Sequence, residues 1–336
     1  MLNSILPFIV LILVVVFIHE YGHYYFAKKY GVKVTDFSIG FGKELFGWND
    51  KLGTRWKICW IPLGGYVKFF GDRNVFSQSD QEEIIKKYSE EERKKLFILK
   101  PLYQRSLIVA AGPIANFILA IVIFLFIYMF VGKDFTPAVI NEVQKDSPAE
   151  VAGLMKNDVI LEIDGTEVKS ILDVSKLITL STSDFIDFKV SRYDQDVLLK
   201  VKPNIVETED NLGNKINKRM IGIMVGPYNN KVNHVKLGPA KALYYSLNEV
   251  YFVTISSLKY LGSILTGSGD SSQLGGPIRI AKITGQVAQF GIVPFLSIMA
   301  YISISLGLIN LFPIPLLDGG HLMLYGFEKI LGRPLS

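Results

Sequence analysis

The stretch that decides the fold is Ile5–Tyr30, which reads ILPFIVLILVVVFIHEYGHYYFAKKY. Its apolar part, residues 5–27, is long enough to cross a bilayer as an α-helix, which takes about 20 residues. The start of the chain, Met1–Ser4, carries no Lys or Arg, and no small-residue cleavage site follows the apolar core, so the run does not resemble a signal peptide. We therefore expect a membrane helix from Ile5 to about Tyr30.

Two further apolar runs, residues 106–131 and 292–316, are also long enough to span a membrane. The chain has 336 residues, of which 49% are hydrophobic and 20% charged. Its mean hydropathy of +0.31 is high for a soluble protein, which must cover its surface with polar side chains. The other segments have the composition of soluble protein. The sequence therefore predicts three membrane helices and one substantial soluble domain.

The distribution of basic residues indicates the orientation in the membrane. Residues 28–105 hold 16 Lys and Arg against 10 Asp and Glu, whereas the short N-terminus holds no basic residue. The positive-inside rule then puts residues 31–105 in the cytoplasm and residues 132–291 outside. No basic stretch interleaved with aromatics suggests nucleic-acid binding. Since Cys59 is the single cysteine, no disulfide can form within the chain.

The segment between the first two membrane helices has the pattern of a β-hairpin. Residues 56–61 and 65–69 alternate polar and apolar side chains and are predicted as strands separated by Pro62-Leu63-Gly64. The tryptophans and other aromatics of this segment suit a hairpin at the membrane interface. Residues 80–100 are predicted as a charged amphipathic helix.

Residues 134–230 read as a soluble α+β domain. Several short β runs flank a helix near residues 171–180, and Asp164-Gly165 is a hairpin-turn signal. Residues 240–265 then form an amphipathic helix, and Gly267–Gly276 is a loop rich in Gly and Ser.

The first membrane helix carries a His-Glu-x-x-His motif at residues 19–23. His19 and His23 are four residues apart, so both imidazoles project from one face of the helix and can bind one Zn²⁺. Glu20 is adjacent and can take a proton from a zinc-activated water. A pair of interfacial histidines without metal is the alternative. Ionisable side chains within a membrane span cost several kcal/mol, which favours the functional interpretation.

A catalytic zinc usually has three protein ligands and one open position, so a third ligand is needed. Asp318 and His321 both follow the third membrane helix, in the segment Asn310–His321, and both are candidates. The prolines of this segment should break the helix, and Gly319-Gly320 should let the backbone turn sharply.

The chain resembles the site-2 protease family of intramembrane zinc metalloproteases, in the branch of the bacterial regulator-of-sigma-E protease. The resemblance covers nearly the whole chain and rests on motifs that occur in the family's order. These are His19–His23, Pro62–Val67, Ala110–Phe117, a PDZ-like domain, Gly275–Ile278 and Asn310–His321.

The resemblance implies a role for each matching residue. His19, His23 and Asp318 would bind zinc, and Glu20 would be the general base and later the acid. It also implies four substrate-binding residues, namely Asn310, Asn116, Gly65 and Tyr66. For Asn310 an interhelical hydrogen bond is the alternative, and for Asn116 a role in helix packing.

The expected fold is a polytopic α-helical membrane protein with a membrane-associated β-hairpin and one inserted PDZ-like α+β domain. The family's fourth membrane helix would follow Gly332-Arg333-Pro334, and the sequence stops before it. The expected segments are the first membrane helix (1–30), the cytoplasmic hairpin and charged helix (31–105), the second membrane helix (106–132), the PDZ-like extracytoplasmic domain (133–230), the amphipathic helix with its loop (231–291), and the third membrane helix with the Asn310–His321 segment (292–336).

The function implied is regulated proteolysis of single-pass membrane helices in the bacterial inner membrane. Clients would be anti-sigma factors or remnant signal peptides, unwound at the hairpin edge after an upstream site-1 protease has acted. Two alternatives remain: an inactive membrane scaffold that presents a PDZ domain, and a His-Glu-x-x-His membrane protease with non-helical substrates.

Overall fold

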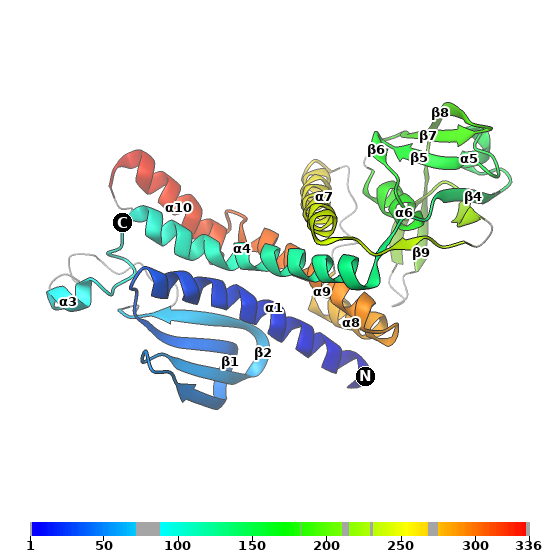
Figure 1. Cartoon of the computed structure of the whole chain (residues 1–336). Helices are drawn as coiled ribbons and strands as arrows, with labels where there is room; N and C mark the ends of the chain where they lie inside the picture. Colours follow the sequence, from blue (N-terminus) through cyan, green and yellow to red (C-terminus); the bar gives the residue numbers. More distant parts are fainter. Residues whose placement is uncertain are drawn as a thin grey trace. The chain divides into compact units, whose positions relative to one another are not determined.

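The structure is a computed structural model and describes residues 2–71, 88–181, 183–209, 215–228, 231–267 and 275–333. The chain divides into two compact units. One unit comprises Met1–Phe124 and Ala281–Ser336, and it contains the His-Glu-x-x-His motif. The other comprises Leu125–Ile280. Figure 1 shows the elements of both.

Three helices of the described residues are long and apolar enough to cross a membrane, as predicted. They are α1 (Leu2–Lys29), α4 (Leu102–Phe126), which continues as the π-helical turn η1 (Ile127–Val131), and α9 (Ile292–Asn310). The second begins four residues before the predicted start at Ser106.

The third membrane helix is shorter than predicted. α9 ends at Asn310, whereas the sequence suggested a helix to Leu316. The reason is that Pro313 and Pro315 disfavour helical backbone at the residues that precede them. After the loop 311–317, a second helix that the sequence reasoning missed, α10 (Asp318–Leu331), begins at the candidate third ligand. The amphipathic helix α8 (Pro277–Gln289) was also missed.

Small residues let the membrane helices pack closely. A Cβ at Gly22 of α1 would overlap the backbone carbonyl of Ala111 in α4. A Cβ at Gly307 of α9 would lie 3.0 Å from the carbonyl oxygen of Pro113 in α4. Such small-residue contacts are typical of membrane helix pairs. Helix α4 therefore packs against both α1 and α9, and Figure 1 shows α1 and α4 side by side.

The sequence predicted a hairpin of residues 56–61 and 65–69, whereas the paired strands of the structure are β1 (Val34–Asn49) and β2 (Arg55–Phe69). The prediction of two strands separated by Pro62-Leu63-Gly64 needs correction, because β2 runs through this segment. Its two halves pair with different partners. Residues 55–58 and 65–69 of β2 lie on opposite edges of residues 34–39 of β1. The second half of β1, residues 44–49, pairs with residues 55–59 of β2. The result is a small curled sheet in which residues 65–69 form an edge.

The sheet packs against the end of α1. Phe37 and Val67 of the sheet share a buried cluster with Ala27 of α1 and Ile108 of α4. Apolar residues that alternate along the strands thus cover the helix, and the sheet is held next to the motif. The charged helix predicted at residues 80–100 is not found in its described part: α3 spans only Glu90–Arg93, and turns follow. Residues 80–87 lie outside the described part of the chain.

The unit Leu125–Ile280 contains the predicted α+β domain. Its main sheet has the order β11-β4-β5-β7-β8, with β6 paired to β5. At the turn after β5, Asp164 and Gly165 both have positive φ, as the hairpin-turn signal predicted. The elements of this sheet and its helices are β4 (Ala138–Val143), α5 (Pro148–Val151), β5 (Val159–Ile163), β6 (Thr166–Glu167), α6 (Ile171–Leu180), β7 (Ile186–Arg192), β8 (Gln195–Val201) and β11 (Ile223–Gly226).

A buried apolar core holds this unit together, with Ile140, Ile163 and Phe188 at its centre. Two further strand pairs and a long helix complete it. They are β3 (Lys133–Asp134) with β12 (His234–Val235), β9 (Asn204–Glu209) with β10 (Lys215–Met220), and α7 (Pro239–Leu265), which was predicted at 240–265.

Candidate metal centre

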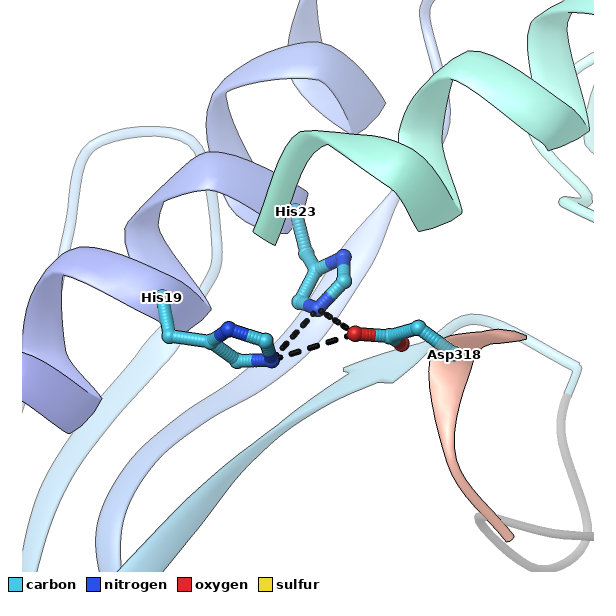
Figure 2. A group of neighbouring side chains, drawn as sticks. All are labelled: His19, His23 and Asp318. Atoms are coloured by element: carbon cyan, nitrogen blue, oxygen red, sulfur yellow. Dashed lines mark hydrogen bonds and ion pairs between the residues drawn. The ribbon is translucent and has the colours of Figure 1, made fainter. Parts of the chain in front are cut away.

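The two histidines of α1 and Asp318 of α10 come together in the structure. The Nε2 atoms of His19 and His23 lie 3.2 Å apart. Oδ2 of Asp318 lies 3.2 Å from Nε2 of His19 and 3.4 Å from Nε2 of His23. Figure 2 shows both rings pointing at this oxygen. These three side chains are the only group of metal-ligating His, Cys, Asp and Glu found among the described residues.

The hydrogen bond of His23 to α4 determines whether the Nε2 atom that faces Asp318 carries a proton. Its Nδ1 lies 2.9 Å from the backbone carbonyl oxygen of Ile108, so Nδ1 carries a proton and donates it. A neutral His23 then presents the lone pair of Nε2 to the carboxylate of Asp318. A lone pair that faces a carboxylate in a buried site needs a cation between the two groups.

The distances fit zinc. Zinc binds histidine nitrogen and carboxylate oxygen at about 2.0–2.2 Å in a tetrahedral arrangement, whose edges are then about 3.3–3.6 Å. The three ligand atoms lie 3.2, 3.2 and 3.4 Å apart, close to one face of such a tetrahedron. The fourth corner is not supplied by this group, which is the pattern of a catalytic rather than a structural site.

Asp318 reaches the histidines because α10 begins there. The two glycines that follow it do not form the sharp turn expected from the sequence. They lie in the first turn of α10, where Cβ atoms on Gly319 and Gly320 would overlap the backbone of the loop 311–317. Their smallness lets the loop fold back on the helix. The rival ligand His321 is not part of the group; its ring lies 6.5 Å from that of Tyr325.

A glycine of α4 forms the wall of the site. A Cβ at Gly112 would lie 2.6 Å from Cε1 of His23 and 2.9 Å from Cε1 of His19. Both rings therefore lie against bare backbone. The sequence reasoning did not assign this glycine a role. The signal that pointed to it was the run of small residues Ala110-Ala111-Gly112 in the middle of an apolar helix.

Glu20 is buried beside the two ligands, and the edge segment of β2 lies against it. A Cβ at Gly65 would lie 3.0 Å from Cγ of Glu20 and 3.0 Å from Cγ1 of Val16. Gly65 therefore permits a close approach of the sheet edge to the carboxylate. The next residue, Tyr66, stacks on Phe41 with ring centroids 6.2 Å apart.

The two asparagines expected to bind substrate lie in different environments. Asn310 is the last residue of α9, half-buried where the loop toward Asp318 begins. Asn116 is fully buried in α4, and its Nδ2 lies 3.3 Å from Nδ1 of His19, on the ring edge that faces away from Asp318. The structure thus puts Asn116 behind a ligand.

Comparison with known proteins identifies the family. The description "Peptidase family M50" matches residues 7–336, nearly the whole chain. The chain belongs to peptidase family M50. This family, which includes the site-2 proteases, is zinc-dependent. Among the described residues, His19, His23 and Asp318 are the group that could hold such an ion.

Relatives from bacteria carry names that agree with the family. The zinc metalloprotease Atu1380 of Agrobacterium fabrum is 41% identical over 99% of this chain and 88% of its own length. The zinc metalloprotease R01501 of Rhizobium meliloti is 40% identical, over 99% of this chain and 89% of its own. Metalloprotease MmpA of Caulobacter vibrioides is 36% identical over 96% of this chain and 85% of its own.

Among solved structures, two PDZ domains match part of the chain. They come from the SdrC-like proteins of Listeria monocytogenes and Listeria innocua, each 24% identical with a TM-score of 0.22. The matches cover 27% and 28% of this chain, and 88% and 99% of those chains. The family and the apolar helices together make this M50 protein an integral membrane zinc metalloendopeptidase.

Proposed function

We propose that this protein hydrolyses a peptide bond inside the membrane-spanning segment of its substrate, with zinc held by His19, His23 and Asp318. One observation carries the proposal: two of the three ligands and Glu20 belong to the apolar part of α1, which is long enough to span the bilayer. Burying these groups at membrane depth is costly, and a protease of soluble substrates has no need for it.

Zinc bound at this site would supply a Lewis acid that polarises a water molecule and the scissile carbonyl. The residues of the chain then move the proton. The carboxylate of Glu20 accepts it as the water attacks, and the resulting carboxylic acid gives it to the nitrogen of the leaving amine. Asn310 donates a hydrogen bond from its amide to the substrate near the scissile bond, where negative charge develops.

The edge segment 65–69 holds the substrate. A membrane helix conceals its peptide bonds in hydrogen bonds along the helix, so it must unwind before water can attack. Residues 65–69 pair with β1 on one side, and their other side has no strand partner among the described residues. An unwound substrate added as a further strand at Gly65 and Tyr66 would lie beside Glu20.

The proposed topology follows the charge distribution. Residues 31–105 are cytoplasmic and the PDZ-like domain is outside the inner membrane. That domain selects clients whose outer part has been removed by a site-1 protease. The proposed clients are anti-sigma factors and remnant signal peptides, each of which has a single apolar segment in the membrane. The zinc site then lies toward the cytoplasmic ends of α1 and α9.

The test uses the purified protein reconstituted in liposomes with a single-pass client, and the products are mapped by mass spectrometry. We expect cuts within the apolar segment of the client. Glu20→Gln should abolish them while the zinc content stays at one per chain, and Glu162→Gln, the same change in the other unit, should leave the rate unaltered. Cleavage by Glu20→Gln at the wild-type rate would overturn the mechanism.

The same assay separates the alternatives. A protease of non-helical substrates would cut outside the apolar segment and would cut a soluble peptide of the same sequence equally fast. A scaffold without activity would cut neither substrate, whatever its zinc content.

A further inference from the structure

The side chain of Asn116 is poorly satisfied for a buried amide. It is fully buried in α4, and its Oδ1 has no hydrogen-bond partner in the described part of the chain. A buried polar atom without a partner costs about 1–3 kcal/mol. The other end of the amide lies 3.3 Å from Nδ1 of His19. Because this amide costs stability and contacts a proposed metal ligand, a role in orienting that ligand explains it better than a role in helix packing.

The proton on His19 decides whether its ring can bind zinc. If Nδ2 of Asn116 donates to Nδ1 of His19, the proton of the neutral ring is on Nε2, the atom that faces Asp318. That tautomer cannot bind a metal through Nε2. Rotating the amide by 180° puts Oδ1 opposite Nδ1 instead. The ring proton is then held on Nδ1, and the Nε2 lone pair is free.

The second ligand shows the same arrangement. Nδ1 of His23 donates to the backbone carbonyl of Ile108, which also belongs to α4. Ile108 and Asn116 are two helical turns apart and serve imidazoles that are one turn apart on α1. Metal-binding histidines almost always donate a hydrogen bond from the N–H of their second ring nitrogen to such an acceptor, which fixes the tautomer and the ring orientation. For His23 the acceptor is backbone; for His19 a side chain must supply it.

We propose that Asn116 is the positioning residue of His19: its Oδ1 accepts the Nδ1 proton and holds the Nε2 lone pair toward the metal. The inference rests on the zinc site proposed above. It goes beyond that site because α4 then supplies the acceptor for the Nδ1 proton of both histidines. Ser303 of α9 donates to the backbone carbonyl of Asn116 at 2.8 Å, which holds α9 against α4 at this residue without involving the amide.

Two substitutions of Asn116 distinguish this role from packing. Asn116→Leu is similar in size and removes the acceptor, so zinc affinity should fall about 10- to 100-fold. Asn116→Asp keeps an acceptor in the same place and should bind zinc within about threefold of the wild type. A role in helix packing predicts the opposite order, because a buried carboxylate disturbs an apolar interface more than a leucine does.

Zinc affinity is measured by competition with a chelator in detergent, and the absorption spectrum of the cobalt-substituted protein reports the ligand geometry. Ser303→Ala, which removes the neighbouring hydrogen bond only, should leave both readouts unchanged. Asn116→Ala replaces the leucine variant if that protein does not fold. Wild-type zinc affinity in the acceptor-free variant that folds, or an equal loss of affinity in Asn116→Asp, would overturn the role of Asn116. If the wild type itself binds no zinc, or His23→Ala binds it as tightly, the zinc site is wrong and the inference fails with it.

Discussion

Replacing Gly112 by Ala tests the geometry of the metal centre with a single methyl group. Gly112 lies in α4 where that helix passes the two imidazoles of α1. An added Cβ would lie 2.9 Å from Cε1 of His19 and 2.6 Å from Cε1 of His23, and closer still to Nε2 of His23. In every other respect alanine favours this position, because it is a better helix former than glycine by about 0.5–1 kcal/mol.

The required displacement can be estimated from these distances. Carbon atoms in contact normally lie about 3.5–4.0 Å apart, so the rings must retreat by roughly 0.6–0.9 Å or more. Zinc sites tolerate errors of only about 0.2 Å in ligand distance. We therefore expect zinc affinity to fall at least about 100-fold, the upper end of what is lost with a ligand-orienting contact. The helical content of the protein should not fall.

The assay is the same chelator competition, with zinc content and circular dichroism measured on each sample. The matched control is Gly326→Ala in α10, where a Cβ would meet nothing within 4 Å. This control makes the same chemical change in the helix that carries Asp318 and should bind zinc as the wild type does. Wild-type zinc affinity in Gly112→Ala would refute the proposed packing of α4 against the two ligands.

Three further predictions concern parts of the molecule that support the site. Buried Arg105 of α4 and half-buried Glu328 of α10 form an ion pair with an N–O distance of 2.5 Å, so Arg105→Ala should destabilise the protein by about 1–3 kcal/mol in denaturant unfolding. Phe188→Ala should cost about 3–5 kcal/mol in the α+β unit and leave zinc binding unaltered. Burial alone would raise the pKa of Asp50, but hydrogen bonds from Thr54, Trp56 and others outweigh it and lower that pKa. The stability that Asp50 contributes is therefore full above its unfolded pKa of about 3.9, and it is lost as pH falls through the lower folded pKa, which tryptophan fluorescence can follow.

Each of these three predictions would be contradicted by a specific result. An Arg105→Ala protein as stable as the wild type would mean that the ion pair does not hold α10. Loss of zinc in Phe188→Ala would show that zinc binding depends on the core of the α+β unit, contrary to the prediction. Asp50→Asn should be less stable at neutral pH and should lose the acid-dependent step, so an unchanged pH profile in that variant would remove Asp50 from the account.

Local sequence was sufficient for the membrane helices and for the two histidines proposed to bind zinc. The 14 apolar residues before His19 leave an α-helix as the structure that satisfies its own backbone in a bilayer. Spacing by four then puts two imidazoles on one face, and the structure has them with Nε2 atoms 3.2 Å apart. The turn at Asp164-Gly165 was readable for a similar reason, since few residue pairs accept positive φ twice.

Predictions failed where distant segments compete for the same backbone. Sequence alone treated Pro62-Leu63-Gly64 as a break between two strands. In the structure, residues 34–39 pair with a strand segment on each edge. Both segments belong to β2, which continues through Pro62-Leu63-Gly64 from one edge to the other. Likewise Gly319 and Gly320 suggested a turn, but their role is to let α10 approach the loop before it. Neither use of glycine is visible without the partner segment.

By itself, the sequence determined that this protein has three apolar helices and that one of them carries two histidines on one face, with a glutamate next to the first of them. These features depend on neighbours within a few residues, whose geometry in a helix is known in advance. Only the tertiary structure brought Asp318 rather than His321 beside the two histidines, placed Gly65 against Glu20, and put the amide of Asn116 next to Nδ1 of His19. Those choices depend on how α4 and α10 pack against α1, and packing is decided by contacts between residues far apart in the chain.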